Sequence, residues 1–135
     1  MADYSELCDI ADQNDILMLG GNLHGSLSMA ICDKGNCTAV FDYSKIDSMP
    51  ELMVCAAHEI GHCVTGAFYT EKSFDLRSRM EYRADKWAIK KLLPKSEMEE
   101  ALKNGYVEVW QLAEYFEVTE EYVKKALWIY FDISL

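Results

Sequence analysis

The chain has 135 residues, half of them hydrophobic, which suits one compact domain with a substantial core. Its formal net charge of −10 disfavours a nucleic-acid-binding surface, because phosphate contacts need clustered Lys and Arg. The sequence has no apolar run of the roughly 18–20 residues that cross a bilayer, and its acidic start lacks the features of a secretory signal, so we expect a cytoplasmic protein without membrane contact.

Residues 1–47 are expected to form an N-terminal helix and a small sheet. A short helix is predicted over 4–11, followed by the apolar, glycine-ended segment ILMLGG at 16–21. Residues 26–32 and 37–43 read as two strands, and the intervening DKGN supplies turn chemistry, which predicts a hairpin. Cys32 and Cys37 flank that turn and would face each other.

The five cysteines favour reduced thiols over a disulfide framework, because their number is odd and no secretory signal is evident. Cys32 and Cys37 are not spaced as a CxxC motif, so a zinc or redox role is the less favoured interpretation, and the sequence does not decide whether they ever pair. Cys55 and Cys63 are expected to be small packing residues of a helix.

Residues 48–94 are expected to hold two helices of one functional unit. The first opens with Ser48 as N-cap and Pro50 in the first turn, repeats apolar residues at helical spacing, and ends near Gly66. A polar loop is predicted over 70–78. An amphipathic helix then covers 79–93 and stops at Pro94.

Residues 95–135 are expected to form further helices. Ser96 precedes Glu99 by three residues, a capping-box pattern, and Gly105 closes that helix. Two more helices are predicted to join near Val118, with Thr119 as the N-cap of the second. A single domain over 1–135, with a small antiparallel hairpin sheet packed on a helical core and followed by C-terminal helices, is of the α+β class.

The stretch CAAHEIGHCVTG, residues 55–66, holds the candidate metal-binding and catalytic residues. On a helix, residues four apart lie on one face, so His58 and His62 can aim both imidazoles at one metal ion. Glu59 can reach a metal-bound water without binding the metal itself, as in the His-Glu-x-x-His arrangement. Gly61 would allow close approach of another backbone or of a substrate. The alternative is a buried helix with two hydrogen-bonded histidines.

A catalytic zinc usually needs a third protein ligand. Glu81, 19 residues after His62, is the best candidate, since it would lie on a second helix packed against the first. Asp85, four residues further on, could accept the free N–H of a ligand histidine. His24, the third histidine, is a competing ligand in a glycine-bounded loop. Glu81 and Asp85 could also be ordinary surface charges.

The segments AAHEIGHCVTG and EYRADKWAIKKLLP together resemble the ImmA/IrrE family of small zinc-dependent metallopeptidases, and the similarity covers about residues 20–127. The resemblance implies a Zn²⁺ cofactor held by His58, His62 and Glu81, with Glu59 as catalytic base. It also implies endopeptidase activity on a protein substrate, a helix-turn-helix repressor of a phage or mobile element. Family members often carry a second acidic residue and Phe where Arg83 and Trp87 stand here.

Substrate contacts are harder to assign from the sequence. The candidate donors to the oxyanion of the reaction are Tyr43, Tyr82, His24 and Arg83. A peptide substrate could add as an extra strand to an exposed edge of the sheet, and residues 38–43 are predicted to form that edge. The candidate substrate-binding residues are therefore Val40, Phe41, Tyr43 and Tyr82.

The sequence also offers two other functions. Residues 110–127 resemble a helix-turn-helix, but residues 107–135 hold six acidic and two basic side chains, which phosphate would repel. A helical pair that packs on the catalytic unit or contacts a protein partner is the favoured interpretation, with no direct nucleic-acid binding. A zinc-holding interaction module without catalysis is the other alternative.

Overall fold

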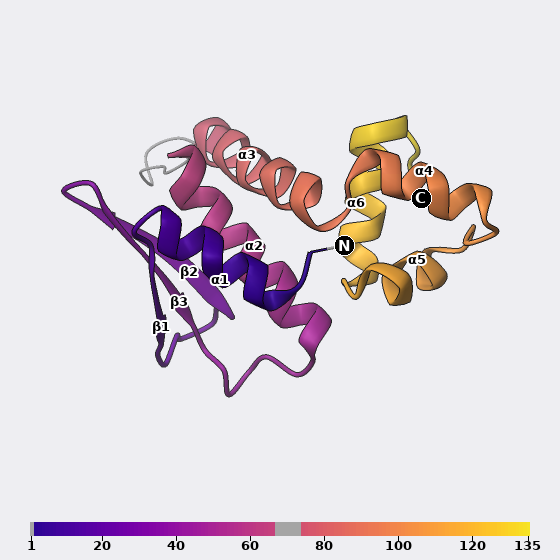
Figure 1. Ribbon diagram of the computed structural model, residues 1–135. Coiled ribbons are helices and arrows are strands. Elements are labelled where there is room, and N and C mark those ends of the chain that lie inside the picture. The colour runs from indigo at the N-terminus through magenta and orange to yellow at the C-terminus, as the bar shows by residue number, and fades with distance from the viewer. Residues whose placement is uncertain (1, 67–73) are drawn as a thin grey trace.

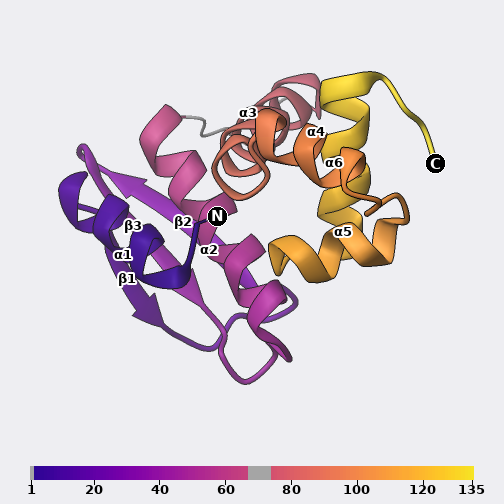
Figure 2. The same ribbon diagram turned by 45° about the vertical axis from the view of Figure 1, so that its right-hand side comes forward.

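The chain divides at helix α2, with a sheet on one side and a set of helices on the other (Figures 1 and 2). The computed structural model describes residues 2–66 and 74–135. The first part holds α1 (Tyr4–Gln13), β1 (Leu17–Gly20), β2 (Ser28–Asp33), β3 (Asn36–Phe41) and α2 (Met49–Thr65). The second part holds α3 (Phe74–Leu92), α4 (Lys95–Lys103), α5 (Val109–Phe116) and α6 (Glu120–Phe131). The predicted α+β class is confirmed.

The predicted hairpin is present and is closed by a two-residue turn. Lys34 and Gly35 both have positive φ, 53° and 83°, as a type I′ turn requires. Cys32 and Cys37 are direct cross-strand partners between β2 and β3. The five thiols are free, as expected for reduced cysteines.

The sheet is mixed, and its order is β1-β3-β2. β1 pairs parallel to β3, so β3 is hydrogen-bonded on both sides. The prediction of a free edge along residues 38–43 is therefore wrong. Val40 and Phe41 cannot pair with a substrate strand, and the Phe41 side chain is fully buried. The free edges belong to β1 and β2.

Helix α2 begins and ends where its sequence predicts. The Ser48 hydroxyl accepts the Glu51 N–H at 3.3 Å, and Pro50 occupies the first turn, where its missing N–H has no consequence. Gly66 ends the helix in the left-handed conformation at φ 67°.

Two helix starts differ from the prediction. α3 begins at Phe74, so the part of the expected loop over 74–78 is helical, while residues 70–73 lie outside the described residues. Polar composition fits a solvated helical turn as well as a loop. α4 begins at Lys95, and the Met98 N–H donates to the Pro94 carbonyl, so Ser96 lies inside the helix and is not its N-cap.

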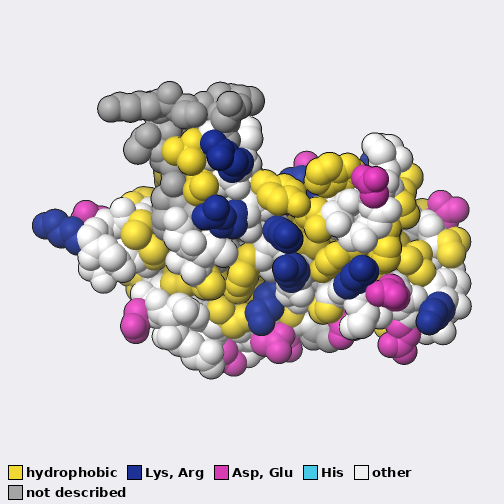
Figure 3. All heavy atoms as spheres, turned by 90° about the horizontal axis from the view of Figure 1, so that it is seen from above, with side chains coloured by type: hydrophobic (Ala, Val, Ile, Leu, Met, Phe, Trp, Pro, Cys, Tyr) yellow, Lys and Arg dark blue, Asp and Glu magenta, His cyan; other side chains and the backbone are white. Residues whose placement is uncertain are grey.

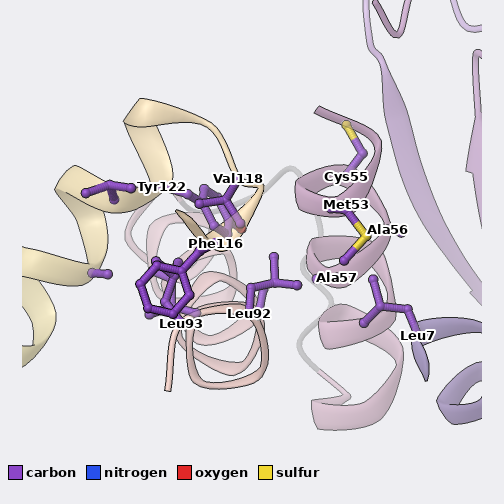
Figure 4. Close-up of a cluster of buried hydrophobic side chains, with 14 of the residues drawn as sticks. Leu7, Met53, Cys55, Ala56, Ala57, Leu92, Leu93, Phe116, Val118 and Tyr122 are labelled. Atoms are coloured by element: carbon purple, nitrogen blue, oxygen red, sulfur yellow. The ribbon is translucent and has the colours of Figure 1, made fainter. Parts of the chain in front are cut away.

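The core lies on both sides of α2 (Figure 4). Leu7, Met53 and Ala56 are buried toward α1 and the sheet, and Leu92, Leu93 and Phe116 are buried among the later helices. α6 adds Val123, Ala126 and Leu127. The predicted packing of the C-terminal helix pair on the rest of the domain is thus confirmed. No helix in the described ranges is long and apolar enough to cross a membrane.

At Gly61 the α2 backbone lies close to the α3 backbone. A Cβ built at this position would lie 2.8 Å from the backbone oxygen of Ala84, and a backbone atom cannot move aside by rotamer change. We therefore expect Gly61→Ala to lower the free energy of unfolding. The clash costs about 1–3 kcal/mol and outweighs the gain of about 0.5–1 kcal/mol from helix propensity. Thermal unfolding of the metal-free protein measures this; a Tm equal to or above the wild type would contradict it.

Candidate metal centre

His58 and His62 face the same point from successive turns of α2. Their Nε2 atoms are 3.2 Å apart, and their rings meet edge to face at 4.7 Å. The Glu59 carboxylate joins them in a group whose ligand-type atoms all lie within 4.8 Å of one another. The predicted arrangement of two imidazoles and one carboxylate on one stretch of helix is therefore present.

Glu81 reaches both histidines from α3. One of its oxygens lies 2.8 Å from His58 Nε2 and the other lies 3.1 Å from His62 Nε2. A tetrahedral zinc ion with ligand bonds of about 2.0–2.2 Å separates its donor atoms by roughly 3.3 Å. The three side chains thus present a nitrogen, nitrogen, oxygen donor set at nearly the spacing that zinc requires.

The competing ligand His24 does not reach this point. It lies in an exposed loop and is absent from the lining of the cavity around His58. The contact between α2 and α3 at Gly61 explains why Glu81 reaches instead, since it brings the two helix backbones together next to His62 and about one turn from His58 and Glu81.

The side chains of this centre form a charged cluster. Burial lowers the pKa of His58, but its hydrogen bonds with Asp85 and Glu81 outweigh this and raise the pKa to about 10. Contacts with His58 and His62 hold the pKa of Glu81 far below its usual range. A divalent cation that takes the place of the proton on His58 would contact the Glu81 carboxylate, and these side chains would not need to move.

Asp85 accepts from His58 on the side away from the candidate metal position. Its Oδ1 lies 2.8 Å from His58 Nδ1, so it holds the imidazole with Nε2 directed at Glu81, as predicted for a residue that fixes the tautomer. Burial alone would raise the pKa of Asp85, yet its hydrogen bonds with His58 and Tyr122 and the nearby charge of Lys125 lower it. Asp85 is therefore an anion whose charge is fully compensated.

Sequence reasoning missed three residues that contact this centre. The Tyr122 hydroxyl donates to Asp85 Oδ1 at 2.5 Å, and the Lys125 ammonium lies 3.0 Å from Oδ2. The Ser28 hydroxyl donates to Glu59 Oε2 at 2.6 Å. Tyr122 is one of the apolar positions at helical spacing along α6, which indicates a core residue. No local pattern relates it to Asp85, which lies 37 positions earlier.

Glu59 is a buried carboxylate that accepts a hydrogen bond from Ser28. Its side chain is buried, and burial raises its pKa, although the hydrogen bond from Ser28 lowers it in part. A carboxylate with a raised pKa is the better base near neutral pH. The Ser28 contact also fixes one oxygen, which leaves the other free to act.

The centre opens into a cavity of about 680 Å³ between β2, α2, α3 and α6, the size of a small-ligand site. Ser26, Leu27 and Ser28 form one wall, and Tyr122 and Lys125 form the opposite wall. The candidate oxyanion donors Tyr43, Tyr82, His24 and Arg83 are all absent from its lining. Tyr82 lines a neighbouring cavity, and Tyr43 stacks on Phe41.

Tyr122→Phe should weaken metal binding while leaving the core packed. The change removes only the hydroxyl that donates to Asp85, and partners of ligand histidines typically contribute 10–100-fold to metal affinity. We expect zinc affinity to fall by about tenfold, at the low end of this range, because Tyr122 contacts the ligand His58 through Asp85. Tyr130→Phe on the same helix is the matched control. Chelator competition measures both variants; equal zinc affinity of Tyr122→Phe and wild type would contradict the role.

A comparison with protein families places a match on this part of the chain. Residues 47–127 match the model Peptidase_M78, described as the IrrE N-terminal-like domain. The matched range holds the three candidate ligands and extends through Tyr122 and Lys125, but it excludes the sheet. The comparisons with curated proteins and with solved structures give no significant match.

Proposed function

The chain belongs to the Peptidase_M78 family, and we propose that it is a zinc-dependent endopeptidase in which His58, His62 and Glu81 hold the metal and Glu59 is the catalytic base. The observation that carries the proposal is the convergence of these three side chains at 2.8–3.2 Å beside a buried carboxylate. The ImmA/IrrE resemblance and the family match agree with it.

A bound zinc ion would supply a Lewis acid that polarises a peptide carbonyl and makes a coordinated water more acidic. Glu59 takes the proton of the attacking water and returns it to the leaving amine. Ser28 holds the carboxylate in place during both transfers. Asp85 keeps His58 oriented, and Tyr122 and Lys125 hold Asp85.

We propose that the substrate peptide pairs with the free edge of β2. This strand begins at Ser28, which lines the cavity and contacts Glu59. The Asp42 N–H donates to the Leu27 carbonyl, so by alternation the backbone groups of Ser28 and Ala30 point away from β3. An extended peptide paired there would lie along the cavity.

Ala30→Pro should therefore reduce cleavage of protein substrates by about tenfold or more while zinc remains bound. Proline removes an outward N–H, which at an edge strand leaves the ladder with β3 intact. Ala30→Ser, which keeps the N–H, is the matched control. Initial rates and zinc content of both variants measure the effect; undiminished cleavage by Ala30→Pro would remove β2 as the docking edge.

The substrate class is proposed from the ImmA/IrrE resemblance: a helix-turn-helix repressor of a phage or mobile element. A helix-turn-helix function for this chain itself has less support, because the inner face of α6 packs in the core and supplies Tyr122 and Lys125 to Asp85. We expect no direct nucleic-acid binding.

The proposal is tested by co-producing the protein with a repressor of its own genetic neighbourhood. One zinc ion per chain and cleavage of the repressor by the wild type, but not by Glu59→Gln, are expected. Zinc without cleavage would favour the non-catalytic zinc-holding module, and a chain that binds no zinc would overturn both interpretations.

A further inference from the structure

A second cavity, of about 420 Å³, adjoins the candidate metal centre between α3 and α6. It shares Glu81, Asp85 and Lys125 with the first cavity, so the two are separated only by these side chains. Its remaining lining consists of Arg77, Ser78, Tyr82, Trp128 and Ile129. A group seated at His58 and Glu81 therefore has this second cavity beside it.

Two exposed aromatic rings form the wall of the second cavity. Trp128 and Tyr82 are 52% and 44% exposed and meet edge to face, with ring centroids 6.4 Å apart. Paired, exposed aromatic side chains next to a reactive centre are typical of a binding surface. The face in Figure 3 carries patches of hydrophobic side chains next to Lys and Arg side chains.

The charged side chains around the second cavity bear on which kind of substrate side chain it accepts. Glu81 contacts both histidines, and Asp85 contacts His58, Tyr122 and Lys125, so neither carboxylate is available to an incoming cation. The Lys125 ammonium is likewise paired with Asp85, and Tyr82, Trp128 and Ile129 supply the apolar part of the lining. The aromatic wall then favours a large apolar or aromatic side chain.

We propose that this cavity is the specificity pocket for one large apolar side chain of the substrate, adjacent to the bond that is cut. The inference rests on the proposed zinc endopeptidase function. The volume is in the range of about 300–1,000 Å³ that takes small ligands, which is sufficient for a Leu, Phe or Trp side chain.

The test uses zinc-loaded protein and two succinyl hydroxamates, one with a benzyl side chain next to the metal-binding group and one without a side chain. Calorimetry gives the affinity of each for wild type, Trp128→Ala and Tyr82→Ala. Trp110→Ala, which removes an equally exposed tryptophan lining a different cavity, is the matched control. A well-fitted apolar group contributes about 10–200-fold.

We expect the benzyl group to increase affinity at least tenfold in wild type and Trp110→Ala, and less than threefold in Trp128→Ala and Tyr82→Ala. The unsubstituted hydroxamate should bind all four proteins equally. A benzyl gain that is absent in wild type, or unchanged in Trp128→Ala and Tyr82→Ala, would overturn the pocket while leaving the zinc centre in place. Failure of both hydroxamates to bind would overturn the zinc centre, and the pocket with it.

Discussion

Glu59→Gln is expected to abolish most peptide-bond cleavage while the protein keeps its full zinc content. Glutamine has the same shape and can still accept the Ser28 hydrogen bond, but it cannot take a proton from water. A positioned general base contributes about 10²–10⁴-fold, so the rate should fall by that factor. Cleavage of a co-produced or purified substrate gives the rate, and elemental analysis gives the zinc content.

Glu51→Gln is the matched control, because Glu51 lies on the same helix and lines the same cavity but does not belong to the His58, Glu59, His62 group. It should retain cleavage close to the wild-type rate. Wild-type activity of Glu59→Gln, or an equal loss in both variants, would contradict the assignment of Glu59 as the base.

Glu81→Ala is expected to lose zinc, while His24→Ala retains it. Zinc binding by protein sites amounts to about 10–16 kcal/mol, so the loss of one of a few ligands should weaken affinity on the order of 10²–10³-fold. The His58 and His62 imidazoles would also lose the carboxylate that contacts both. Chelator competition measures the affinities of the two variants side by side.

The opposite result, zinc lost from His24→Ala and kept by Glu81→Ala, would restore the histidine loop as the source of the third ligand. The pair of variants thus decides between the two candidates that the sequence left open. The exposed position of His24 makes its replacement neutral for folding, so any loss of zinc there would report ligation directly.

Features set by local rules could be read from the sequence. The spacing of His58 and His62, the Ser48 and Gly66 caps of α2, the hairpin turn and the Thr119 N-cap of α6 depend on residues a few positions apart, and the structure confirms each of them. The position of Glu81 was also predictable, since a helix that packs antiparallel on α2 returns its side chains to the histidines.

Features that depend on contacts between residues far apart in the sequence could not be read from it. The central position of β3 depends on its parallel pairing with β1, about 20 residues earlier, and no local pattern distinguishes a central from an edge strand in so small a sheet. Tyr122 is apolar over most of its surface and follows the core stripe of α6, so the role of its hydroxyl becomes visible only beside Asp85. Nothing in the sequence around Ser28 distinguishes it from other strand residues, and its role is visible only from its contact with Glu59 of α2.

The contact of Tyr122 with Asp85 links the last helix of the chain to the candidate metal centre. The three candidate ligands and Asp85, the partner of His58, all lie within the first 85 residues. The Tyr122 hydroxyl and the Lys125 ammonium, which contact Asp85, lie 37 and 40 residues further along the chain. A nascent chain thus carries the metal-binding side chains before it can fix their orientation. The orientation of His58 by Asp85 thus depends on the docking of α6, the last helix of the chain.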